Sequence, residues 1–240
     1  ESLAAVGVVT AFLSMLIWVL GQSRSAISSI VSQYVGANKI NEVKDLPIQA
    51  IAIILLISTV VCVITYPFSR SIFSLYNASG LLLDYSVSYY KIRVIGLPFT
   101  LYVFAVFGVF RGLQNTYYPM IIAITGATVN ILLDFILVYG IKDWFLPLNL
   151  QGAAIASVLS QLLMAVLATY YLLKKTEIPL RYSMPFNKEI PKFLNMIGHL
   201  IIRTLALNTA LYLATRFATG YGNEYIAAYT ISINLWLIIL

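Results

Sequence analysis

Seven long apolar runs, joined by short polar connections, constrain this chain more than any other feature of its sequence. Each run is long enough, at about 1.5 Å per residue in a helix, to cross a hydrocarbon layer about 30 Å thick. The runs are continuous, whereas the strands of a membrane barrel alternate polar and apolar residues. They therefore predict an all-α, polytopic membrane helical bundle. The predicted spans are 8–35, 47–68, 86–112, 117–140, 150–173, 191–217 and 223–240.

Composition excludes several other classes of protein. The chain is 60% hydrophobic and 10% charged, which is too apolar for a soluble domain with a polar exterior. Its net charge of +6 comes from basic residues in the connections between runs, so we expect no nucleic acid partner. The one cysteine, Cys62, excludes a disulfide within the chain and a cysteine-based metal cluster. We expect membrane lipid and a small molecule as partners, and no cofactor.

The distribution of basic residues predicts the orientation in the membrane. Connections after the first, third and fifth spans carry Lys39, Lys44, Arg111, Lys174, Lys175, Arg181, Lys188 and Lys192, and the other connections carry Arg70, Lys142 and Arg216. The first set is therefore predicted to be cytoplasmic. Lys91 and Arg93, near the outer end of the third predicted span, are predicted to extend their charged ends to the interface.

An acid and an amide lie in the middle of the fourth run. Asp134 and Asn130 stand inside residues 120–138, which are otherwise apolar. A carboxylate at this depth costs about 2.5 to 3.5 kcal/mol on insertion scales, and such a residue is by default a candidate for function. Residues four apart share one face of a helix, so we expect both side chains to point into the same cavity.

Depth along the fifth span predicts partners for these two residues. Counted at 1.5 Å per residue from the outer ends of the two spans, Asp134 lies about 9 Å inward and Ser157 about 10 Å. Asn130 lies about 15 Å inward and Gln161 about 16 Å. The matched oxygens predict a site that holds a proton on Asp134, or Na⁺ with Asp134 and Asn130 as ligands. For Ser157 and Gln161, hydrogen bonding between helices for assembly alone stays open.

Other intramembrane polar residues are supporting candidates. Arg24 in the first span and Arg203 in the sixth either neutralise Asp134 or line a water-filled cavity. His199, one turn before Arg203, is a secondary candidate for titration. Gly152 and Ala156, four residues apart, predict close approach of another helix backbone.

A faint internal repeat predicts the domain organisation. Residues 1–8 align with residues 224–231, with identity at the glutamate and at both alanines. An offset across six spans is typical of a duplicated six-helix unit with parallel halves. We therefore expect residues 1–175 to be an N-terminal lobe that lacks its first helix. Residues 176–190 are predicted to be a cytoplasmic loop, and residues 191–240 to start the C-terminal lobe.

Five short motifs together resemble one transporter family. They are Leu-Ala-Ala-Val-Gly at 3–7, Ser-Gln-Tyr-Val-Gly-Ala-Asn at 32–38, Arg-Gly-Leu-Gln-Asn-Thr-Tyr-Tyr-Pro at 111–119, Asn-Ile-Leu-Leu-Asp at 130–134, and Gly-Ala-Ala-Ile-Ala-Ser at 152–157. In order and spacing the chain resembles a multidrug and toxic compound extrusion (MATE) transporter of the DinF-like bacterial branch. The resemblance implies that the seven spans are helices two to eight of twelve.

The resemblance also implies roles for single residues. Asn130, Asp134 and Ser157 stand where this family places the cation site of its N-terminal lobe, with serine in place of the more usual threonine. The sixth span carries Arg203 and Asn208 but no carboxylate, which argues against the branch that depends on a glutamate there. The function implied by the resemblance is that of a multi-pass, monomeric transporter of the bacterial inner membrane. It would export amphiphilic, often cationic compounds by alternating access, coupled to an H⁺ or Na⁺ gradient.

Two alternatives remain open from the sequence. One is a flippase for lipid-linked oligosaccharides within the same superfamily. The other is an integral membrane enzyme, which is disfavoured because paired carboxylates for Mg²⁺ are missing and only Asp134 lies well inside a span. We therefore expect no enzymatic activity.

Overall fold

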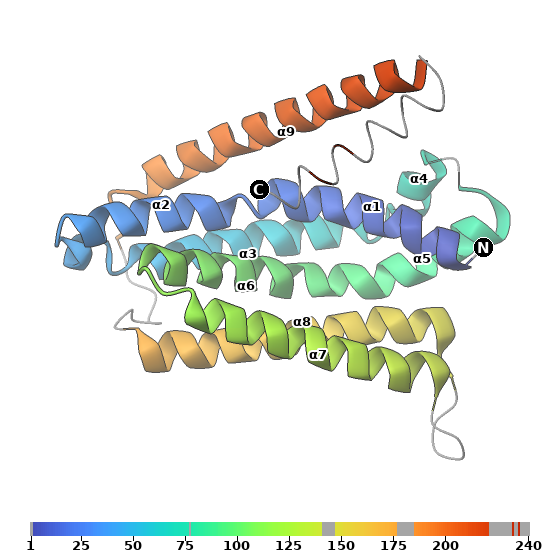
Figure 1. The fold of residues 1–240 in the computed structure, drawn as a ribbon, viewed down its shortest axis with the longest axis horizontal. Helices are drawn as coiled ribbons and strands as arrows, with labels where there is room; N and C mark the ends of the chain where they lie inside the picture. Colours follow the sequence, from blue (N-terminus) through green and yellow to red (C-terminus); the bar gives the residue numbers. More distant parts are fainter. Residues whose placement is uncertain are drawn as a thin grey trace. The chain divides into compact units, whose positions relative to one another are not determined.

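The computed structural model describes residues 2–76, 78–140, 147–176 and 185–220, together with Ser232 and Leu235. Within these residues the chain is helical and contains no strand (Figure 1). The elements are α1 (Ser2–Leu20), α2 (Ser23–Gly36), η1 (Ile40–Val43), α3 (Leu46–Thr65), α4 (Ser69–Ser74), α5 (Gly80–Arg93), η2 (Val94–Gly96), α6 (Leu97–Gly112), α7 (Tyr117–Tyr139), α8 (Asn149–Lys175) and α9 (Ile190–Gly220), where η denotes a 3₁₀ helix.

Six stretches of the described chain are long and apolar enough to cross a membrane. They are Ser2–Gly36, Ile40–Thr65, Gly80–Gly112, Tyr117–Tyr139, Asn149–Lys175 and Ile190–Thr215. The first six predicted spans and the all-α membrane fold are thereby confirmed. The seventh predicted span, 223–240, lies outside the described residues except for Ser232 and Leu235.

The first span bends between α1 and α2. The Gly21 N–H donates to Ile17 O at 2.8 Å, and the Arg24 N–H donates to Gly21 O at 3.1 Å, so backbone hydrogen bonds flank the bend on both sides. A Cβ on Gly21 would press against the Phe104 ring of α6. Glycine therefore lets the first span approach α6 at the bend.

The third span is interrupted near its middle. α5 ends at Arg93, and η2 links it to α6. Pro98, in the first turn of α6, has no N–H for the carbonyl four residues earlier, which favours a tightened turn at Val94–Gly96. Because α5 begins at Gly80, Arg93 lies about 20 Å along the helix from the outer end of the span. The Arg93 guanidinium lies against Gln161 of α8, so it does not extend to the interface as predicted.

Residues Glu1–Ile197 form one compact unit. Within it α7 packs along α8, α2 and α3 pack on α6, α1 packs on α5, and α8 also contacts α5 and α6. An aromatic cluster fixes the outer end, with Phe73 5.2 Å from Tyr90 and 6.0 Å from Phe12 between ring centroids. The Tyr90 hydroxyl donates to Thr65 Oγ1 at 2.7 Å, so this large buried side chain has its polar atom satisfied.

Residues Gly198–Leu240 form a second unit. The division falls inside α9, after Ile197, whereas the sequence suggests a boundary in the loop 176–190. The lobe limits stay a prediction. The structure adds that the first two turns of α9 belong with the first unit.

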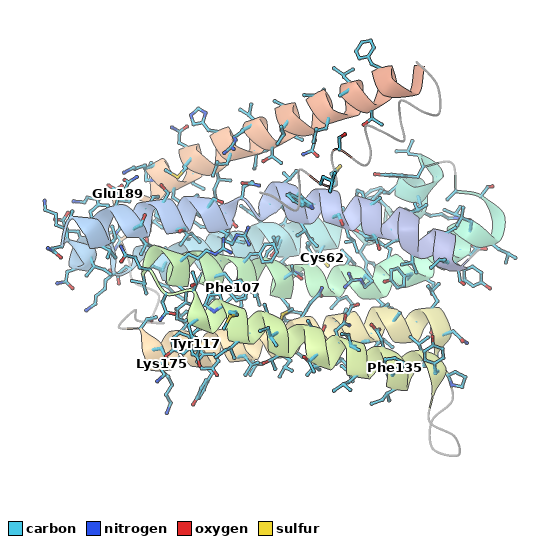
Figure 2. The ribbon with its side chains drawn as sticks, in the orientation of Figure 1. Cys62, Phe107, Tyr117, Phe135, Lys175 and Glu189 are labelled. Atoms are coloured by element: carbon cyan, nitrogen blue, oxygen red, sulfur yellow. The ribbon has the colours of Figure 1, made fainter. Side chains whose placement is uncertain are left out.

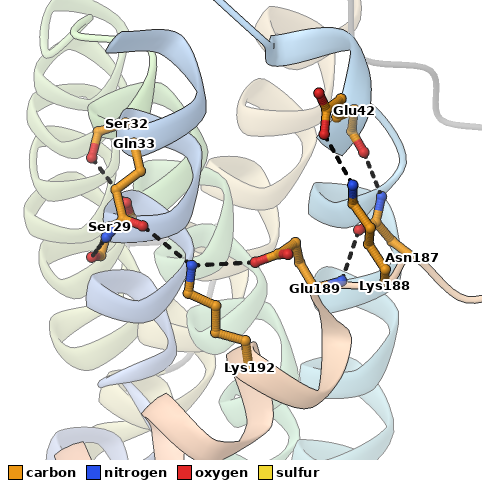
Figure 3. A network of polar contacts seen from close by, with 8 residues as sticks. All are labelled: Ser29, Ser32, Gln33, Glu42, Asn187, Lys188, Glu189 and Lys192. Atoms are coloured by element: carbon orange, nitrogen blue, oxygen red, sulfur yellow. Dashed lines mark hydrogen bonds and ion pairs between the residues drawn. The ribbon is translucent and has the colours of Figure 1, made fainter. Parts of the chain in front are cut away.

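A polar network fastens the start of α9 to the connection between α2 and α3 (Figure 3). We call it the cytoplasmic network, after the predicted orientation, and it comprises Gln33, Glu42, Gln49, Asn187, Lys188, Glu189 and Lys192. The Asn187 N–H donates to Gln49 Oε1 at 2.8 Å, and Asn187 Nδ2 donates to Glu42 O at 3.0 Å. Gln49 is fully buried, so these bonds hold residue 187 firmly against α3.

Ion pairs complete the cytoplasmic network. Lys188 Nζ lies 3.0 Å from Glu42 Oε2, and Lys192 Nζ lies 3.3 Å from Glu189 Oε2. Lys192 also donates to Gln33 Oε1 at 3.3 Å. The hydrogen bond to the Glu42 carboxylate raises the pKa of the Lys188 ammonium above its ordinary value. Each charged side chain drawn in Figure 3 thus has an oppositely charged partner.

Candidate functional site

α7 turns one polar-bearing face toward the rest of the bundle. Ile122, Gly126, Asn130, Asp134 and Val138, each four residues apart, are buried or half-buried. Phe135, about 100° further around the helix, is 63% exposed and projects from the outer surface of α7 (Figure 2). Asp134 is therefore not on the exposed face that lipid or another helix would cover.

Both predicted site residues on α7 have buried polar atoms without a partner. Asp134 Oδ1 and Asn130 Nδ2 are each inaccessible to solvent, and neither makes a hydrogen bond within the described part of the chain. Buried polar atoms are nearly always paired, so an unpaired acceptor and an unpaired donor one turn apart require an explanation. A bound proton or cation would explain the unpaired acceptor of Asp134, and a water molecule would pair with the unpaired donor of Asn130.

Two close contacts set the register between α7 and α8. A Cβ on Gly152 would collide with the α7 backbone at Leu137 and Val138, and a Cβ on Gly126 would collide with Met164. Both contacts run between antiparallel helices and twelve residues separate them on each helix, from Gly126 to Val138 and from Gly152 to Met164.

Interpolation between these two contacts places Asp134 level with Ala156 and Ser157, and Asn130 level with Ser160 and Gln161. This is the layering that the depth count predicts. Gly152 and Ala156 are fully or almost fully buried, in keeping with the close approach predicted for them.

The hydroxyl of Ser157 is directed along its own helix. Ser157 Oγ donates to Ala153 O at 3.0 Å, and Ser160 Oγ donates to Ser157 O at 2.9 Å. The donor capacity of Ser157 is therefore used, but its hydroxyl oxygen keeps lone pairs for a cation or a second donor. Ser157 is half-buried and level with Asp134, so it can act as an acceptor in the site.

Gln161 connects α8 to the interrupted third span. In the amide orientation that satisfies its neighbours, its oxygen accepts from Arg93 Nη1 at 3.1 Å and its nitrogen donates to Gly96 O at 3.3 Å. Thr100 Oγ1 lies 3.2 Å from the same amide oxygen. A Cβ on Gly96 would collide with the Gln161 side chain, so glycine permits this approach.

Sequence reasoning missed Arg93 as a member of the site. The guanidinium binds Gln161, one helical turn from the layer of Asp134, and Arg93 Nε is buried without a hydrogen-bond partner among the described residues. The available signal was the Ser79-Gly80 start of α5, which places Arg93 at mid-depth. We call Arg93, Asn130, Asp134, Ser157 and Gln161 together the midspan site.

An open cavity of about 810 Å³ lies toward the outer end of the same helices. Its lining includes Asp84 and Ser88 of α5, Val138 of α7, and Gln151 and Ala153 of α8. Val138 is one turn from Asp134, and Ala153 is one turn from Ser157. The outer layer of the midspan site therefore lies one helical turn below a cavity wide enough for water and ions.

The supporting arginines have other surroundings. The Arg24 guanidinium stacks over Phe104, 5.2 Å from the ring centroid. The described contacts thus give Arg24 no pairing with Asp134. Arg203 and Asn208 belong to the second unit, where Arg203 is exposed and Asn208 Nδ2 donates to Thr204 O at 2.8 Å. His199 of the same unit is exposed.

The chemistry of the midspan site suits a proton or a hard monovalent cation. Among the described residues, no three His, Cys, Asp or Glu side chains come together as a transition-metal site would need. The oxygens of Asp134, Asn130 and Ser157 are the kind of donor that hard cations prefer.

Comparisons with known proteins agree with this architecture. The family model MatE matches residues 1–136. Multidrug export protein MepA of Staphylococcus haemolyticus is 30% identical over 192 residues, which cover 75% of this chain and 40% of that protein. Protein DETOXIFICATION 43 of Arabidopsis thaliana is 32% identical over 150 residues, which cover 62% of this chain and 27% of that protein.

Solved structures share the fold along nearly the whole chain. A crystal structure of MATE in the bent conformation superposes with a TM-score of 0.89 at 21% identity, over 99% of this chain and 53% of the other. An outward-facing multidrug resistance MATE family transporter of the MOP superfamily gives 0.84 at 22% identity, again over 99% and 53%. The chain therefore spans about half of the solved transporters and less than half of these two curated relatives.

Proposed function

This chain belongs to the MatE family, and from that premise we propose that it forms part of a secondary active efflux transporter. The transporter exports amphiphilic, often cationic compounds from the cell by alternating access, in exchange for H⁺ or Na⁺. It works in the cytoplasmic membrane of a bacterium. Export is also what the name of the staphylococcal relative states for that protein.

One observation supports the proposal more than any other. A half-buried acid and a half-buried amide at mid-depth each have a buried polar atom without a partner among the described residues, and the acid lies one turn below an open cavity. Burying polar groups without partners costs free energy, which a protein tolerates where the groups bind something during function. Asp134 accepts a proton, or Asp134 and Asn130 with Ser157 hold Na⁺.

Coupling depends on a difference in affinity. An ion shifts the balance between outward-facing and inward-facing states only as far as it binds one of them more tightly. An uncompensated carboxylate in an apolar span is costly, so a bound proton or Na⁺ lowers the free energy of the states that bury Asp134 most deeply. Entry of substrate into the cavity favours the state with the ion released.

The experiment uses the full-length protein in proteoliposomes with ethidium as the transported probe. Asp134→Asn is expected to abolish efflux driven by an H⁺ or Na⁺ gradient, with normal insertion and yield. Asp45→Asn is the matched control, because Asp45 is an acid at the start of α3 whose side chain does not cap that helix. Normal ethidium efflux by Asp134→Asn would remove Asp134 from the mechanism.

A further inference from the structure

Arg93 is a charged residue held in the middle of a membrane span. It is half-buried, lies at the C-terminal end of α5, and directly precedes the 3₁₀ turn of η2. A charge at such a depth is rare and nearly always faces a partner or a water-filled cavity. Arg93 therefore needs a functional or structural partner within the bundle.

Only part of the Arg93 guanidinium has a hydrogen-bond partner in the structure. Nη1 donates to the Gln161 amide oxygen at 3.1 Å, whereas Nε is buried and has no hydrogen-bond partner among the described residues. A neutral amide compensates a cation less well than a carboxylate does. While it contacts Gln161, Arg93 can therefore still form a pair with a carboxylate.

Asp134, whose charge is opposite to that of Arg93, also has a buried polar atom without a partner. Its Oδ1 is buried without a hydrogen-bond partner, and Asp134 lies one helical turn from the layer of Gln161, which binds Arg93. No ion pair shorter than 4.0 Å joins the two residues in the described chain, where the ion pairs all involve other side chains. Opposite charges are therefore near one another but not in contact.

Other charged and titratable groups on the neighbouring helices are engaged elsewhere. On α8, Tyr170, Tyr171, Lys174 and Lys175 lie at the opposite end of the helix from the layer of Asp134. On α6, Tyr102 hydrogen-bonds Thr169 and Arg111 lies in the last turn. On α5, Asp84 pairs with Arg70 at 3.0 Å and Lys91 lies over the Tyr66 ring. Among the described residues of these three helices, Arg93 is the charged group nearest in level to Asp134.

We propose that Arg93 is a tethered cation that exchanges between Gln161 and Asp134, taking the place of the coupling ion when that ion leaves. The proposal rests on the coupling role proposed above for Asp134. With a proton or Na⁺ on Asp134, Arg93 stays on Gln161, as in this structure. When the ion departs, the guanidinium pairs with the free carboxylate.

The interruption at Val94–Gly96 supplies the local freedom for this exchange. Arg93 is the last residue of α5, so a small change in the η2 turn redirects its side chain without moving the rest of the helix. Pairing with Arg93 removes the cost of a bare carboxylate in the span, so the ion-free transporter can reorient once it carries substrate. Arg93 is thus a positioning residue for ion release.

The experiment measures the protonation of Asp134 itself and requires no transport. Full-length protein in detergent is treated with dicyclohexylcarbodiimide, which modifies protonated carboxyl groups in apolar surroundings, and labelling of Asp134 is quantified by mass spectrometry across pH. In Arg93→Gln the pH of half-maximal labelling should rise by about one unit or more, because the neighbouring positive charge is lost. The Na⁺ concentration that half-protects Asp134 should fall about tenfold if Na⁺ binds there.

Three further variants test the direction of the shift and provide controls. Gln161→Ala releases Arg93 toward Asp134, so half-maximal labelling should move to lower pH. Arg93→Lys keeps the charge and should stay near the wild type. Lys91→Gln removes a cation two residues away that lies over Tyr66, and should leave the midpoint unchanged.

Unshifted midpoints in both Arg93→Gln and Gln161→Ala would overturn the proposal, as would a shift of the same size in Lys91→Gln. If Arg93→Gln fails to fold, the opposite shift in Gln161→Ala decides the matter. Absence of labelling at Asp134 in the wild type across about pH 4 to 9 would also contradict it. Efflux by Asp134→Asn tests the proposed function separately, so the two failures are distinguishable.

Discussion

The midspan site and the cytoplasmic network are both polar clusters, but they differ in how many of their polar atoms have partners. In the cytoplasmic network, Asn187 makes paired bonds to Gln49 and Glu42, and its lysines lie beside glutamates. In the midspan site, Asp134 Oδ1, Asn130 Nδ2 and Arg93 Nε are buried without hydrogen-bond partners among the described residues.

This difference distinguishes a cluster that stabilises the fold from a cluster that binds a ligand. A cluster whose polar atoms are mostly paired stabilises one arrangement, and here it holds the start of α9 against α3 and the connection that precedes it. Its Glu189 Oε2 makes no hydrogen bond but lies 3.3 Å from Lys192 Nζ. A cluster with unpaired buried atoms lowers stability and persists where a ligand or a second arrangement completes it. Substitutions in the two clusters should therefore affect different measurements.

The largest expected effect is on transport from the midspan site. Asn130→Leu removes an amide whose Nδ2 has no described partner, so efflux of ethidium should fall about tenfold or more. The midpoint of thermal unfolding should stay the same or rise, because an unpaired polar atom is replaced by an apolar one. Loss of transport together with a marked drop in thermal stability would indicate a packing role instead.

The next largest effect is on stability, from the cytoplasmic network. Gln49→Leu leaves the Asn187 N–H without its acceptor beside a fully buried position, at a cost of about 1 to 3 kcal/mol. Thermal unfolding of the full-length protein in detergent measures this loss. The pH dependence of Asp134 labelling in the same variant should match that of the wild type. A shift in the pH of half-maximal labelling would indicate that the two clusters are coupled.

A smaller effect on transport is expected from Ser157. Its hydroxyl already donates within α8, so Ser157→Ala should lower proton-coupled efflux less than about twofold. The same variant removes a ligand oxygen if Na⁺ is the coupled ion, and the Na⁺ concentration for half-maximal efflux should then rise. Comparing efflux under a pure pH gradient with efflux under a pure Na⁺ gradient separates the two cases.

The smallest effect is expected from an exposed ion pair. The folded-state pKa of Lys188 is raised by Glu42, so the contribution of this pair to stability is fully present below the ordinary lysine pKa. It is lost as the pH rises through the raised value. The small difference in unfolding temperature between the wild type and Lys188→Gln should therefore vanish at strongly alkaline pH. A difference that persists there would point to contacts other than the charge.

Much of the fold and part of the midspan site could be predicted from the sequence. Continuous apolar runs fix the spans because hydrocarbon leaves the backbone few alternatives. Helical spacing and depth counting relate Asn130 and Asp134 to Ser157 and Gln161, since these residues lie on one hairpin with a short connection.

Long-range features could not be obtained in this way. Arg93 was misplaced because Asp84 and Tyr85 interrupt the apolar pattern and hide the true start of α5 at Gly80. The network between Glu42 and Asn187 joins residues far apart in sequence, where no periodicity relates them. Gly96 and Pro98 were available as signals of the interruption, but nothing in the sequence links that interruption to Gln161.

Ion movement that accompanies substrate movement tests the central claim most directly. Proteoliposomes of the full-length protein are loaded with ethidium and the pH dye pyranine, and the outward ethidium gradient provides the only driving force. The wild type should acidify the lumen, or take up ²²Na⁺, as ethidium leaves, and Asp134→Asn should move neither ion. Ion uptake coupled to ethidium loss in Asp134→Asn would contradict the assignment of Asp134 as the coupling residue.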